Sequence, residues 1–204
     1  MELRHKTLAV LGWGREGRAR FEYFQINSIK ADYLDENGAA DRSGFPRHTV
    51  TGPMAFDHLD RYGMIFRSPG IRPHHPKLKA VQKKLTSLTR LFFDLWPGKI
   101  AGVTGTKGKG TTASFIKSIF DHADLLSLLV GNIGFVSLLN LDKYGRNDWA
   151  IMELSSFQLM DLGVSPDVAV LLDVTSEHMD YHPNIAEYRA AKLEITSHQT
   201  KDDW

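Results

Sequence analysis

Short apolar runs alternate with amphipathic segments along the whole chain, which is the pattern of strands separated by helices. In the first half, this pattern predicts strands at residues 7–11, 31–35, 48–51 and 63–67, and helices at 16–25 and 77–85. In the second half, it predicts strands at 100–104, 126–130, 149–154 and 167–172, and helices at 112–122 and from Asn184 onward. Strands joined through helices form parallel sheets, so the chain is predicted to be an α/β protein.

Two of these segments carry expectations about burial. The helix over residues 112–122 is expected to gather its large apolar side chains on one face, namely Phe115, Ile116, Ile119 and Phe120. The strand over residues 167–172 is apolar throughout, as buried strands of a parallel sheet tend to be. A domain boundary is predicted at Trp96-Pro97-Gly98, which gives domains at residues 1–95 and 96–204.

The last predicted helix contains a lysine on its apolar face. Asn184 and Glu187 form a capping-box pattern at its start. Lys192 follows Tyr188 by four residues and precedes Ile195 by three, so the three side chains share one face. Such a lysine either extends its amine to solvent along the apolar surface or directs it inward at a charged site. The spacing leaves both alternatives open.

Composition narrows the classes of function. The 204 residues include 25 Lys and Arg against 24 Asp and Glu, a net charge of +1 that gives no reason to expect nucleic acid or an anionic membrane as a partner. The absence of cysteine excludes disulfides, thiolate metal sites and cysteine nucleophiles, and it fits a reducing compartment. The apolar run Leu8–Leu11 is too short for a signal peptide, and no run approaches the ~18 residues of a membrane helix. We therefore expect a cytoplasmic protein.

A glycine-rich run, GVTGTKGKGTT over residues 102–112, joins a predicted strand to a predicted helix. Glycines let backbone N–H groups close around phosphate oxygens, and the following helix directs its positive end at the same point. Lys109 is placed to neutralise β- and γ-phosphates, and a hydroxyl just after it would hold magnesium. The general pattern is not met in full, because Val103 replaces a glycine and Gly110 replaces Ser or Thr. A flexible Gly/Lys turn is the alternative interpretation.

A second glycine motif, GWGREG over residues 12–17, also follows a strand and precedes a helix. Asp35 ends the next strand about twenty residues later, where a ribose-binding acid falls in dinucleotide-binding folds. A tight turn without a ligand and a nicotinamide-dependent enzyme are both open readings of this motif alone. A nicotinamide enzyme does not explain a second phosphate loop in so short a chain.

Acidic and histidine side chains follow two later strands. Glu153 ends the strand at 149–154, beside the phosphate loop, where a carboxylate is a natural magnesium ligand or else a solvated strand end. The segment DVTSEHMDYH over residues 173–182 holds several polar side chains, among which His178 is the candidate for a functional role. Its spacing is not that of a zinc site.

Taken in order over about residues 7–200, these segments resemble the Mur ligase family. GVTGTKGKGTT is similar to the family's ATP loop, GNIG at 131–134 is a further family segment, and residues 173–192 are similar to its histidine-to-lysine segment. ELSSFQL at 153–159 and GWGREG point to the member that adds D-glutamate, and SPGI at 68–71 fits its UDP-binding first domain. The resemblance implies a Rossmann-like first domain followed by an incomplete parallel-sheet P-loop ATPase domain.

The resemblance also implies roles for individual residues. The ATP phosphates would be wrapped by Gly105, Thr106, Lys107, Gly108, Lys109, Gly110, Thr111 and Thr112. The UDP-muramoyl substrate would be held by Gly14, Arg15, Asp35, Ser68, Gly70, Asn132 and His178. Magnesium would be bound through Thr111, Glu153, His178 and a Lys192 carbamylated by CO₂. Lys109, His178 and Lys192 would be the catalytic residues.

The implied reaction is ATP-dependent joining of D-glutamate to UDP-N-acetylmuramoyl-L-alanine through an acyl phosphate, in peptidoglycan precursor synthesis, by a monomeric enzyme. The sequence departs from the family pattern at Gly110, at Asp173 where asparagine is usual, and at Glu177 where aspartate is usual. Family members have three domains, so the chain is expected to be a truncated form that lacks the C-terminal amino-acid-binding domain and is inactive alone. The alternatives are a non-catalytic nucleotide-binding fragment and another ligase of the Mur or folylpolyglutamate type.

Overall fold

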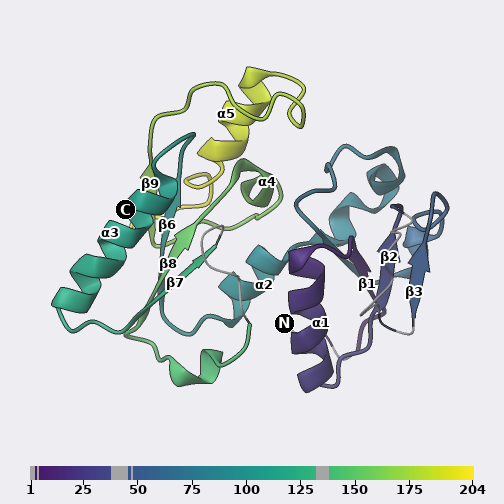
Figure 1. The fold of residues 1–204 in the computed structure, drawn as a ribbon, viewed down its shortest axis with the longest axis horizontal. Helices are drawn as coiled ribbons and strands as arrows, with labels where there is room; N and C mark the ends of the chain where they lie inside the picture. The colour runs from purple at the N-terminus through teal and green to yellow at the C-terminus, as the bar shows by residue number, and fades with distance from the viewer. Residues whose placement is uncertain (1–2, 4, 38–45, 47, 132–137) are drawn as a thin grey trace. The chain divides into compact units, whose positions relative to one another are not determined.

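The computed structural model describes residues 3, 5–37, 46, 48–131 and 138–204, and of the helical residues 15, 16, 19 and 20 it describes the backbone only. The chain divides into two compact units, Met1–Leu88 and Thr89–Trp204. Each unit contains one parallel sheet with helices connecting its strands (Figure 1). The predicted α/β class with parallel sheets is confirmed.

The sheet of the first unit is built from five parallel strands. In chain order they are β1 (Leu8–Leu11), β2 (Asp32–Asp35), β3 (Thr49–Thr51), β4 (Met64–Arg67) and β5 (Leu85–Thr86). Their spatial order is β3-β2-β1-β4-β5, which reverses direction at β1 as in doubly wound nucleotide-binding sheets. Helix α1 (Arg15–Ile26) makes the first crossover, and the Phe24 ring packs edge-on against Phe66 of β4 at 5.4 Å.

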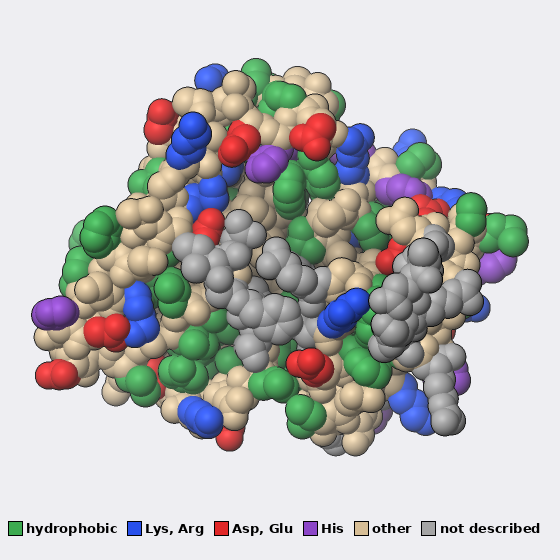
Figure 2. Space-filling model, in the orientation of Figure 1, with side chains coloured by type: hydrophobic (Ala, Val, Ile, Leu, Met, Phe, Trp, Pro, Cys, Tyr) green, Lys and Arg blue, Asp and Glu red, His purple; other side chains and the backbone are tan. Residues whose placement is uncertain are grey.

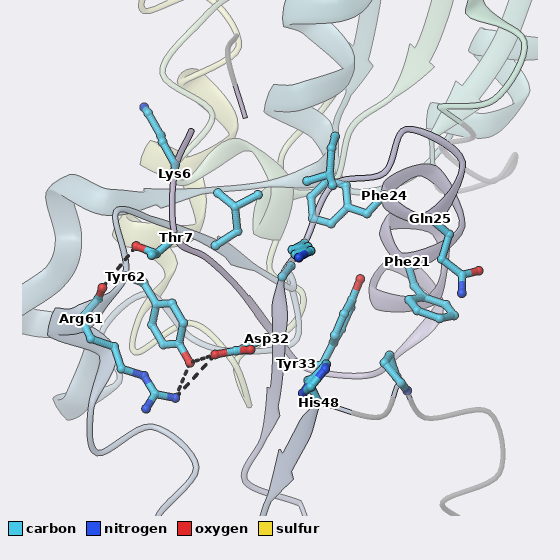
Figure 3. A pocket seen from close by; sticks show the side chains of 15 residues that line it. Lys6, Thr7, Phe21, Phe24, Gln25, Asp32, Tyr33, His48, Arg61 and Tyr62 are labelled. Atoms are coloured by element: carbon cyan, nitrogen blue, oxygen red, sulfur yellow. Dashed lines mark hydrogen bonds and ion pairs between the residues drawn. The ribbon is translucent and has the colours of Figure 1, made fainter. Parts of the chain in front are cut away.

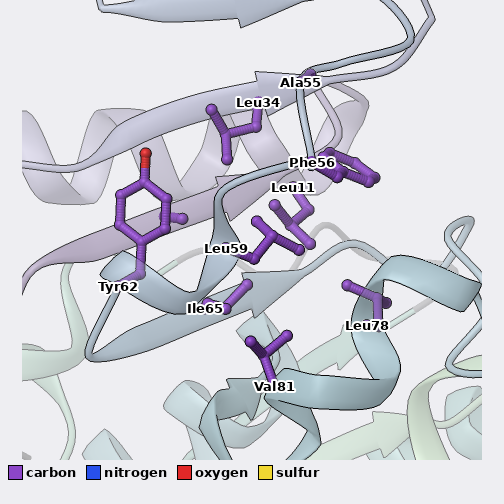
Figure 4. Packing of buried hydrophobic residues seen from close by; sticks show 10 residues of the cluster. Leu11, Leu34, Ala55, Phe56, Leu59, Tyr62, Ile65, Leu78 and Val81 are labelled. Carbon is purple, nitrogen blue, oxygen red and sulfur yellow. The ribbon is translucent and has the colours of Figure 1, made fainter.

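The core of the first unit lies between the sheet and two 3-10 segments, η1 (Leu59–Arg61) and η2 (Pro76–Lys84). Figure 4 shows this packing, to which β1, β2 and β4 contribute Leu11, Leu34 and Ile65 and the connecting segments contribute Ala55, Phe56, Leu59, Tyr62, Leu78 and Val81. The predicted helix at 77–85 is thus a 3-10 segment. Side chains three residues apart eclipse in that geometry, and both Leu78 and Val81 are buried against the sheet.

The second unit has a four-stranded parallel sheet in the order β7-β8-β6-β9. Its strands are β6 (Lys99–Thr104), β7 (Ser127–Gly131), β8 (Trp149–Glu153) and β9 (Val168–Leu171). Its helical segments are α2 (Leu88–Leu95), α3 (Lys109–His122), η3 (Leu141–Lys143), α4 (Ser156–Leu159) and α5 (Ile185–Leu193). The sequence pattern did not predict the short helices α2 and α4.

Helix α2 lies almost wholly in the second unit. The domain boundary predicted from the sequence, at residues 96–98, falls after this helix. Phe92 of α2 stacks on Trp96 with ring centroids 5.5 Å apart, and Trp96 packs against Tyr144 at 4.8 Å. The division between the two units therefore falls after Leu88.

The prediction that α3 gathers its four large apolar side chains on one buried face holds for two of them only. Ile116 and Phe120 pack on a small core of Val103, Ala113 and Ile151, but Phe115 and Ile119 are 66% and 65% exposed. The reason is that 115 and 119 share one side of the helix while 116 and 120 are rotated by about 100°, and only the latter side meets the sheet. Hydrophobic side chains stand on the surface in the region of α3 (Figure 2).

Strand β9 was expected to be buried but lies at the sheet edge. Its side chains are only partly covered, and Leu171 is 40% exposed. On the side away from β6, the N–H of Ala169 donates to the carbonyl of Trp204 at 2.6 Å, and the N–H of Trp204 donates to the carbonyl of Asp167 at 2.9 Å. Within the described ranges, no helix combines the length and the apolar character needed to cross a membrane.

Candidate nucleotide site

The glycine-rich run of the second unit forms a loop at the carboxyl end of β6. Gly105 and Gly108 have φ angles of 152° and 82°, a left-handed region that other residues rarely adopt. Gly108 is the N-cap of α3, so the free N–H groups of the first helical turn lie at the loop. A methyl group at Gly105 would come within 2.6 Å of Leu172 Cβ, so only glycine fits there. The loop therefore has the backbone shape and the helix end that bind phosphate.

Thr106 connects this loop to two distant segments. Its hydroxyl accepts a hydrogen bond from the N–H of Thr175 at 2.9 Å and lies 3.1 Å from the hydroxyl of Tyr188 on α5. Its own N–H donates to the carbonyl of Asp173 at 2.9 Å. The phosphate loop is thus held in place by the segment after β9 and by the last helix. Thr106 was predicted in the loop from the sequence, whereas Tyr188 was not predicted as a site residue.

The cationic and hydroxyl groups at the start of α3 differ in their surroundings. Lys109 Nζ donates to the carbonyl of Thr106 at 2.8 Å and so lies folded over the loop. Thr111 is exposed and, with Gly108 and Gly110, lines a hollow of about 720 Å³ that continues along α3 past Ser114, Phe115 and Ser118. Lys107 is exposed, and Thr112 N–H donates to Gly108 O inside the helix.

Lys192 is directed inward, which decides between the two alternatives left open by the sequence. Its side chain is 2% exposed, and Nζ donates to the carbonyl of Gly105 at 2.7 Å and lies 4.8 Å from the centre of the Tyr188 ring. Burial, and then the nearby positive charge of Lys109, lower its pKa from 10.5 to about 8, against the opposing effect of Glu177 and Glu153. A substantial fraction of the amine is therefore neutral near physiological pH.

Glu153 lies buried at the carboxyl end of β8, with a relative exposure of 4%. Its Oε2 has no hydrogen-bond partner within the described part of the chain. A buried carboxylate oxygen without a partner is costly, so its presence favours a cation or donor that binds there. Gly131 of β7 is paired with Glu153 in the sheet, and a methyl group on Gly131 would lie 2.2 Å from the backbone carbonyl oxygen of Glu153. Donor type and burial both fit a hard cation such as Mg²⁺.

His178 lies on the segment between β9 and α5, with a φ angle of 56° that is uncommon for a residue other than glycine. Its side chain is 47% exposed, 3.8 Å from Glu177 and 5.0 Å, between ring centres, from Phe157. Across the described residues, no group of three His, Asp or Glu side chains is arranged to hold a metal ion. Asn132, assigned to the muramoyl substrate from the sequence, lies outside the described residues.

The candidate UDP residues of the first unit gather at the carboxyl ends of its strands. Asp35 accepts hydrogen bonds from the N–H groups of Trp13 at 2.8 Å and Asn37 at 2.9 Å, so it shapes the GWGREG turn directly. Ser68 Oγ donates to the carbonyl of Gly12 at 3.2 Å. Gly14 opens into free space, with no atom within 4 Å of the position of a methyl group.

The remaining residues of that site are partly described. Gly70 also opens into free space, and Arg15 begins α1 but only its backbone is described. Sequence reasoning missed Arg67, a buried side chain at the end of β4 that donates to the carbonyls of Ser68 at 3.3 Å and Ile71. The sequence feature that could have revealed Arg67 is its place at the end of an apolar strand, directly before the Ser-Pro-Gly turn.

A separate cavity of about 1130 Å³ lies at the opposite, amino end of β1 and β2. Aromatic side chains of α1 and β2 line it, and at one side the Tyr62 hydroxyl donates to Asp32 at 2.7 Å and Arg61 lies 3.6 Å from the same carboxylate (Figure 3). Ligands of doubly wound sheets bind at the carboxyl ends of strands, so this cavity lies away from the expected site.

Comparison with known proteins identifies the family. Residues 103–204 match the family model described as the Mur ligase middle domain. The chain belongs to the Mur ligase family. The matched region contains residues 105–112 of the glycine-rich loop, Glu153, His178 and Lys192, and so covers the candidate ATP and metal residues of the second unit.

Two curated relatives of this Mur ligase chain carry the same name. The UDP-N-acetylmuramoylalanine–D-glutamate ligase of Ruminiclostridium cellulolyticum is 34% identical over 99% of this chain and 46% of the relative. The enzyme of the same name from Leuconostoc mesenteroides is 32% identical over all of this chain and 48% of the relative. The chain thus spans about half the length of the curated relatives that it matches.

Solved structures support the same fold. The UDP-N-acetylmuramate–alanine ligase of Thermotoga maritima superposes with a TM-score of 0.53 at 18% identity, over 94% of this chain and 47% of that one. A UDP-N-acetylmuramate:L-alanyl-γ-D-glutamyl-meso-diaminopimelate ligase from Neisseria superposes with a TM-score of 0.55 at 15% identity, over 94% and 67%. At these identities the likeness concerns the fold alone.

Proposed function

We propose that this chain forms the UDP-substrate and ATP-loop part of a ligase that joins D-glutamate to UDP-N-acetylmuramoyl-L-alanine, with ATP hydrolysed to ADP and phosphate. One observation carries the proposal: a glycine-rich loop at a helix N-terminus on which a buried lysine, Lys192, rests. The Glu153 carboxylate, whose Oε2 has no hydrogen-bond partner in the described residues, is close enough to affect the pKa of Lys192. The names of the curated relatives support the choice of substrates.

In the proposed reaction, a carboxylate oxygen of the muramoyl substrate attacks the γ-phosphorus of ATP, and ADP leaves. The amine of D-glutamate then attacks the acyl phosphate carbon, loses a proton and expels inorganic phosphate, which forms the amide. Lys109 would turn from the Thr106 carbonyl to the β- and γ-phosphates and offset their charge. The N–H groups at the start of α3 would hold the phosphate oxygens, with Gly105 and Gly108 keeping the loop shape.

Mg²⁺ fits the proposed site through Glu153, whose buried Oε2 has no partner in the described residues, and through Thr111 at the start of α3. The ion would supply charge neutralisation of the transferring phosphoryl group. His178 would hold the muramoyl substrate or a second ion. Asp35, Ser68, Gly14, Arg15 and Gly70 would surround the UDP group in the first unit, where open space at the two glycines gives a diphosphate room to approach the backbone.

Lys192 would act as a carbamate. With a pKa of about 8, roughly a quarter of the amine is uncharged at pH 7.5. The neutral nitrogen attacks CO₂ and releases a proton, which turns a buried cation into an anion. That anion would remove the repulsion between Lys192 and Lys109 and would support a cation near Glu153.

Calorimetric titration of the chain with Mg·ATP and, separately, with UDP-N-acetylmuramoyl-L-alanine tests the proposal. Both ligands are expected to bind, and Lys109→Ala should weaken Mg·ATP binding at least tenfold, about 1.4 kcal/mol. Lys117→Ala, on the same helix and paired with Asp121, is the matched control and should bind like the parent. Absence of Mg·ATP binding at millimolar concentration, or equal effects of both substitutions, would overturn the proposal.

Turnover separates the proposed ligase from a non-catalytic nucleotide-binding fragment. The assay measures phosphate release that depends on both the muramoyl substrate and D-glutamate. It is run with this chain and with a protein as long as the curated relatives. Binding by this chain without product, together with product from the longer protein, is the expected result. Binding of folate substrates in place of the UDP substrate would instead favour a ligase of the folylpolyglutamate type.

A further inference from the structure

Three side chains of the second unit, Ser156, His182 and Glu187, form a hydrogen-bonded triad that the proposed reaction does not use. Ser156 Oγ lies 2.9 Å from His182 Nε2, and His182 Nδ1 lies 3.1 Å from Glu187 Oε1. The order Ser–His–Glu and both distances match those of hydrolase triads. Ser156 and His182 are, however, only 2% and 1% exposed, so no substrate can reach the serine. The arrangement is therefore not a second catalytic centre.

The hydrogen-bond partners of His182 determine which of its ring nitrogens carries the proton. A carboxylate only accepts, so Nδ1 of His182 carries the hydrogen and donates it to Glu187. In the neutral imidazole, Nε2 then accepts the hydroxyl hydrogen of Ser156. Each of the two ring nitrogens is thus engaged, and the ring plane is further fixed by stacking on Phe157 at 5.6 Å and by an edge contact with Tyr188 at 5.2 Å.

The two outer side chains of this hydrogen-bonded triad, Ser156 and Glu187, belong to the two elements that carry site residues. Ser156 is the first residue of α4, three residues after Glu153 at the end of β8. Glu187 is in the first turn of α5, whose inner face bears Tyr188 and Lys192. Helices α4 and α5 pack against each other in the second unit (Figure 1). His182 therefore bridges the Glu153 strand end and the Lys192 helix.

We propose that His182 is a positioning residue which, through Ser156 and Glu187, locks α5 onto the Glu153 strand end and so keeps the Lys192 amine on the carbonyl of Gly105. The inference rests on the proposed function for its role in catalysis. Its structural content concerns Lys192 alone, and Lys192 can be observed without any nucleotide.

The test measures how fast Lys192 of the 204-residue chain is acetylated by sulfo-N-hydroxysuccinimide acetate at pH 8, relative to the exposed Lys201, by peptide mass spectrometry. His182→Phe keeps the ring packing and removes both hydrogen bonds, and it should raise the Lys192 rate at least tenfold. Glu187→Ala and Ser156→Ala each remove one bond and should raise it several-fold. His182→Asn, whose amide nitrogen can replace Nδ1, should retain part of the protection.

A matched pair on the same part of the chain provides the control. His198 and Glu194 lie 3.8 Å apart, and both side chains are more than 40% exposed. His198→Phe and Glu194→Ala should leave the Lys192 rate within twofold of the parent. If His182 only stabilised the fold, His182→Phe would lower the midpoint of thermal unfolding. Lys192 would then stay protected from acetylation at temperatures well below that midpoint.

The outcomes decide separately on the two proposals. A Lys192 rate in folded His182→Phe within twofold of the parent would overturn the positioning role. Should that variant fail to fold, Glu187→Ala decides in its place, because the Glu187 side chain is 23% exposed whereas the His182 side chain is fully buried. Failure of the parent chain to bind Mg·ATP overturns the proposed function without altering the acetylation result.

Discussion

The amine of Lys192 donates a 2.7 Å hydrogen bond to the carbonyl of Gly105, which lies 87 residues earlier in the chain. That contact places a second lysine against the backbone of the glycine-rich loop after β6, on which Lys109 also rests. Two positive side chains at one loop repel each other, and a bound anion would relieve that repulsion. The same contact makes Lys192 sensitive to pH, to the charge of its neighbours and to the docking of α5.

Stability should rise with pH in a window set by Lys192. Its pKa is about 8 in the folded chain and 10.5 when exposed, so between these values the unfolded chain binds more protons and unfolding becomes less favourable. The gain amounts to roughly 3 kcal/mol across the window and vanishes well below pH 8, where both states carry the proton. Urea unfolding from pH 7.5 to 10.5 should show this rise in the parent and in Lys201→Met, but not in Lys192→Met.

Glu153→Gln should separate ligand binding from stability. The carboxylate is buried with one oxygen unpartnered in the described residues, so its replacement by an amide should leave the unfolding free energy unchanged within ~1 kcal/mol or raise it. Binding of Mg·ATP should weaken at least tenfold, whereas binding of ATP in EDTA should change little. Calorimetry with and without magnesium checks this, and equal losses under both conditions would contradict a metal role for Glu153.

The two outer glycines of the Gly14–Gly17 segment should respond differently to substitution. A methyl group at Gly17 would lie 2.4 Å from the carbonyl oxygen of Gly12, whereas at Gly14 it would meet nothing within 4 Å. Gly17→Ala should therefore cost about 1–3 kcal/mol of stability, and Gly14→Ala at most about 1 kcal/mol as an N-cap change. Chemical denaturation monitored by a tryptophan signal of the first unit measures both. A larger loss in Gly14→Ala would show that the turn is shaped otherwise.

Helix α3 offers a matched comparison of buried and exposed apolar positions. Ile116→Ala should destabilise the second unit by about 1–3 kcal/mol, because Ile116 packs on the core of Val103 and Ile151. Phe115→Ala, one residue earlier and 66% exposed, should change stability by less than about 0.5 kcal/mol. Thermal unfolding of both variants distinguishes the observed orientation from the one that the apolar pattern alone suggested.

The sequence predicted most of the fold because its strands and helices differ clearly in period and length. The strand ending at Thr104 and the helix after it, predicted at residues 112–122 and observed from Lys109, were identified by the glycines between them. Short elements were missed, since the four residues of α4 are too few to show a helical period. The edge position of β9 was missed because an apolar run looks the same at the edge and in the middle of a sheet.

The candidate site was predictable where motif and position coincide, as at Lys109 and Glu153. It was not predictable where a side chain acts through a partner distant in sequence. His182 shares a ten-residue segment with His178, and nothing in the local pattern shows that His182 is buried against Ser156 while His178 is half exposed. The direction of Lys192 likewise depended on the surface against which its helix packs.

The hydroxyl pair of Thr106 and Tyr188 spans 82 residues, and it joins the first crossover of the second unit to its last helix. During synthesis, the loop residues emerge from the ribosome well before the helix that completes their hydrogen bonding. Contacts of such long sequence separation form late and slow the folding of a domain. The phosphate loop therefore gains its last hydrogen bonds only once α5 is in place, and a chain interrupted ahead of α5 would carry the glycine motif without those contacts.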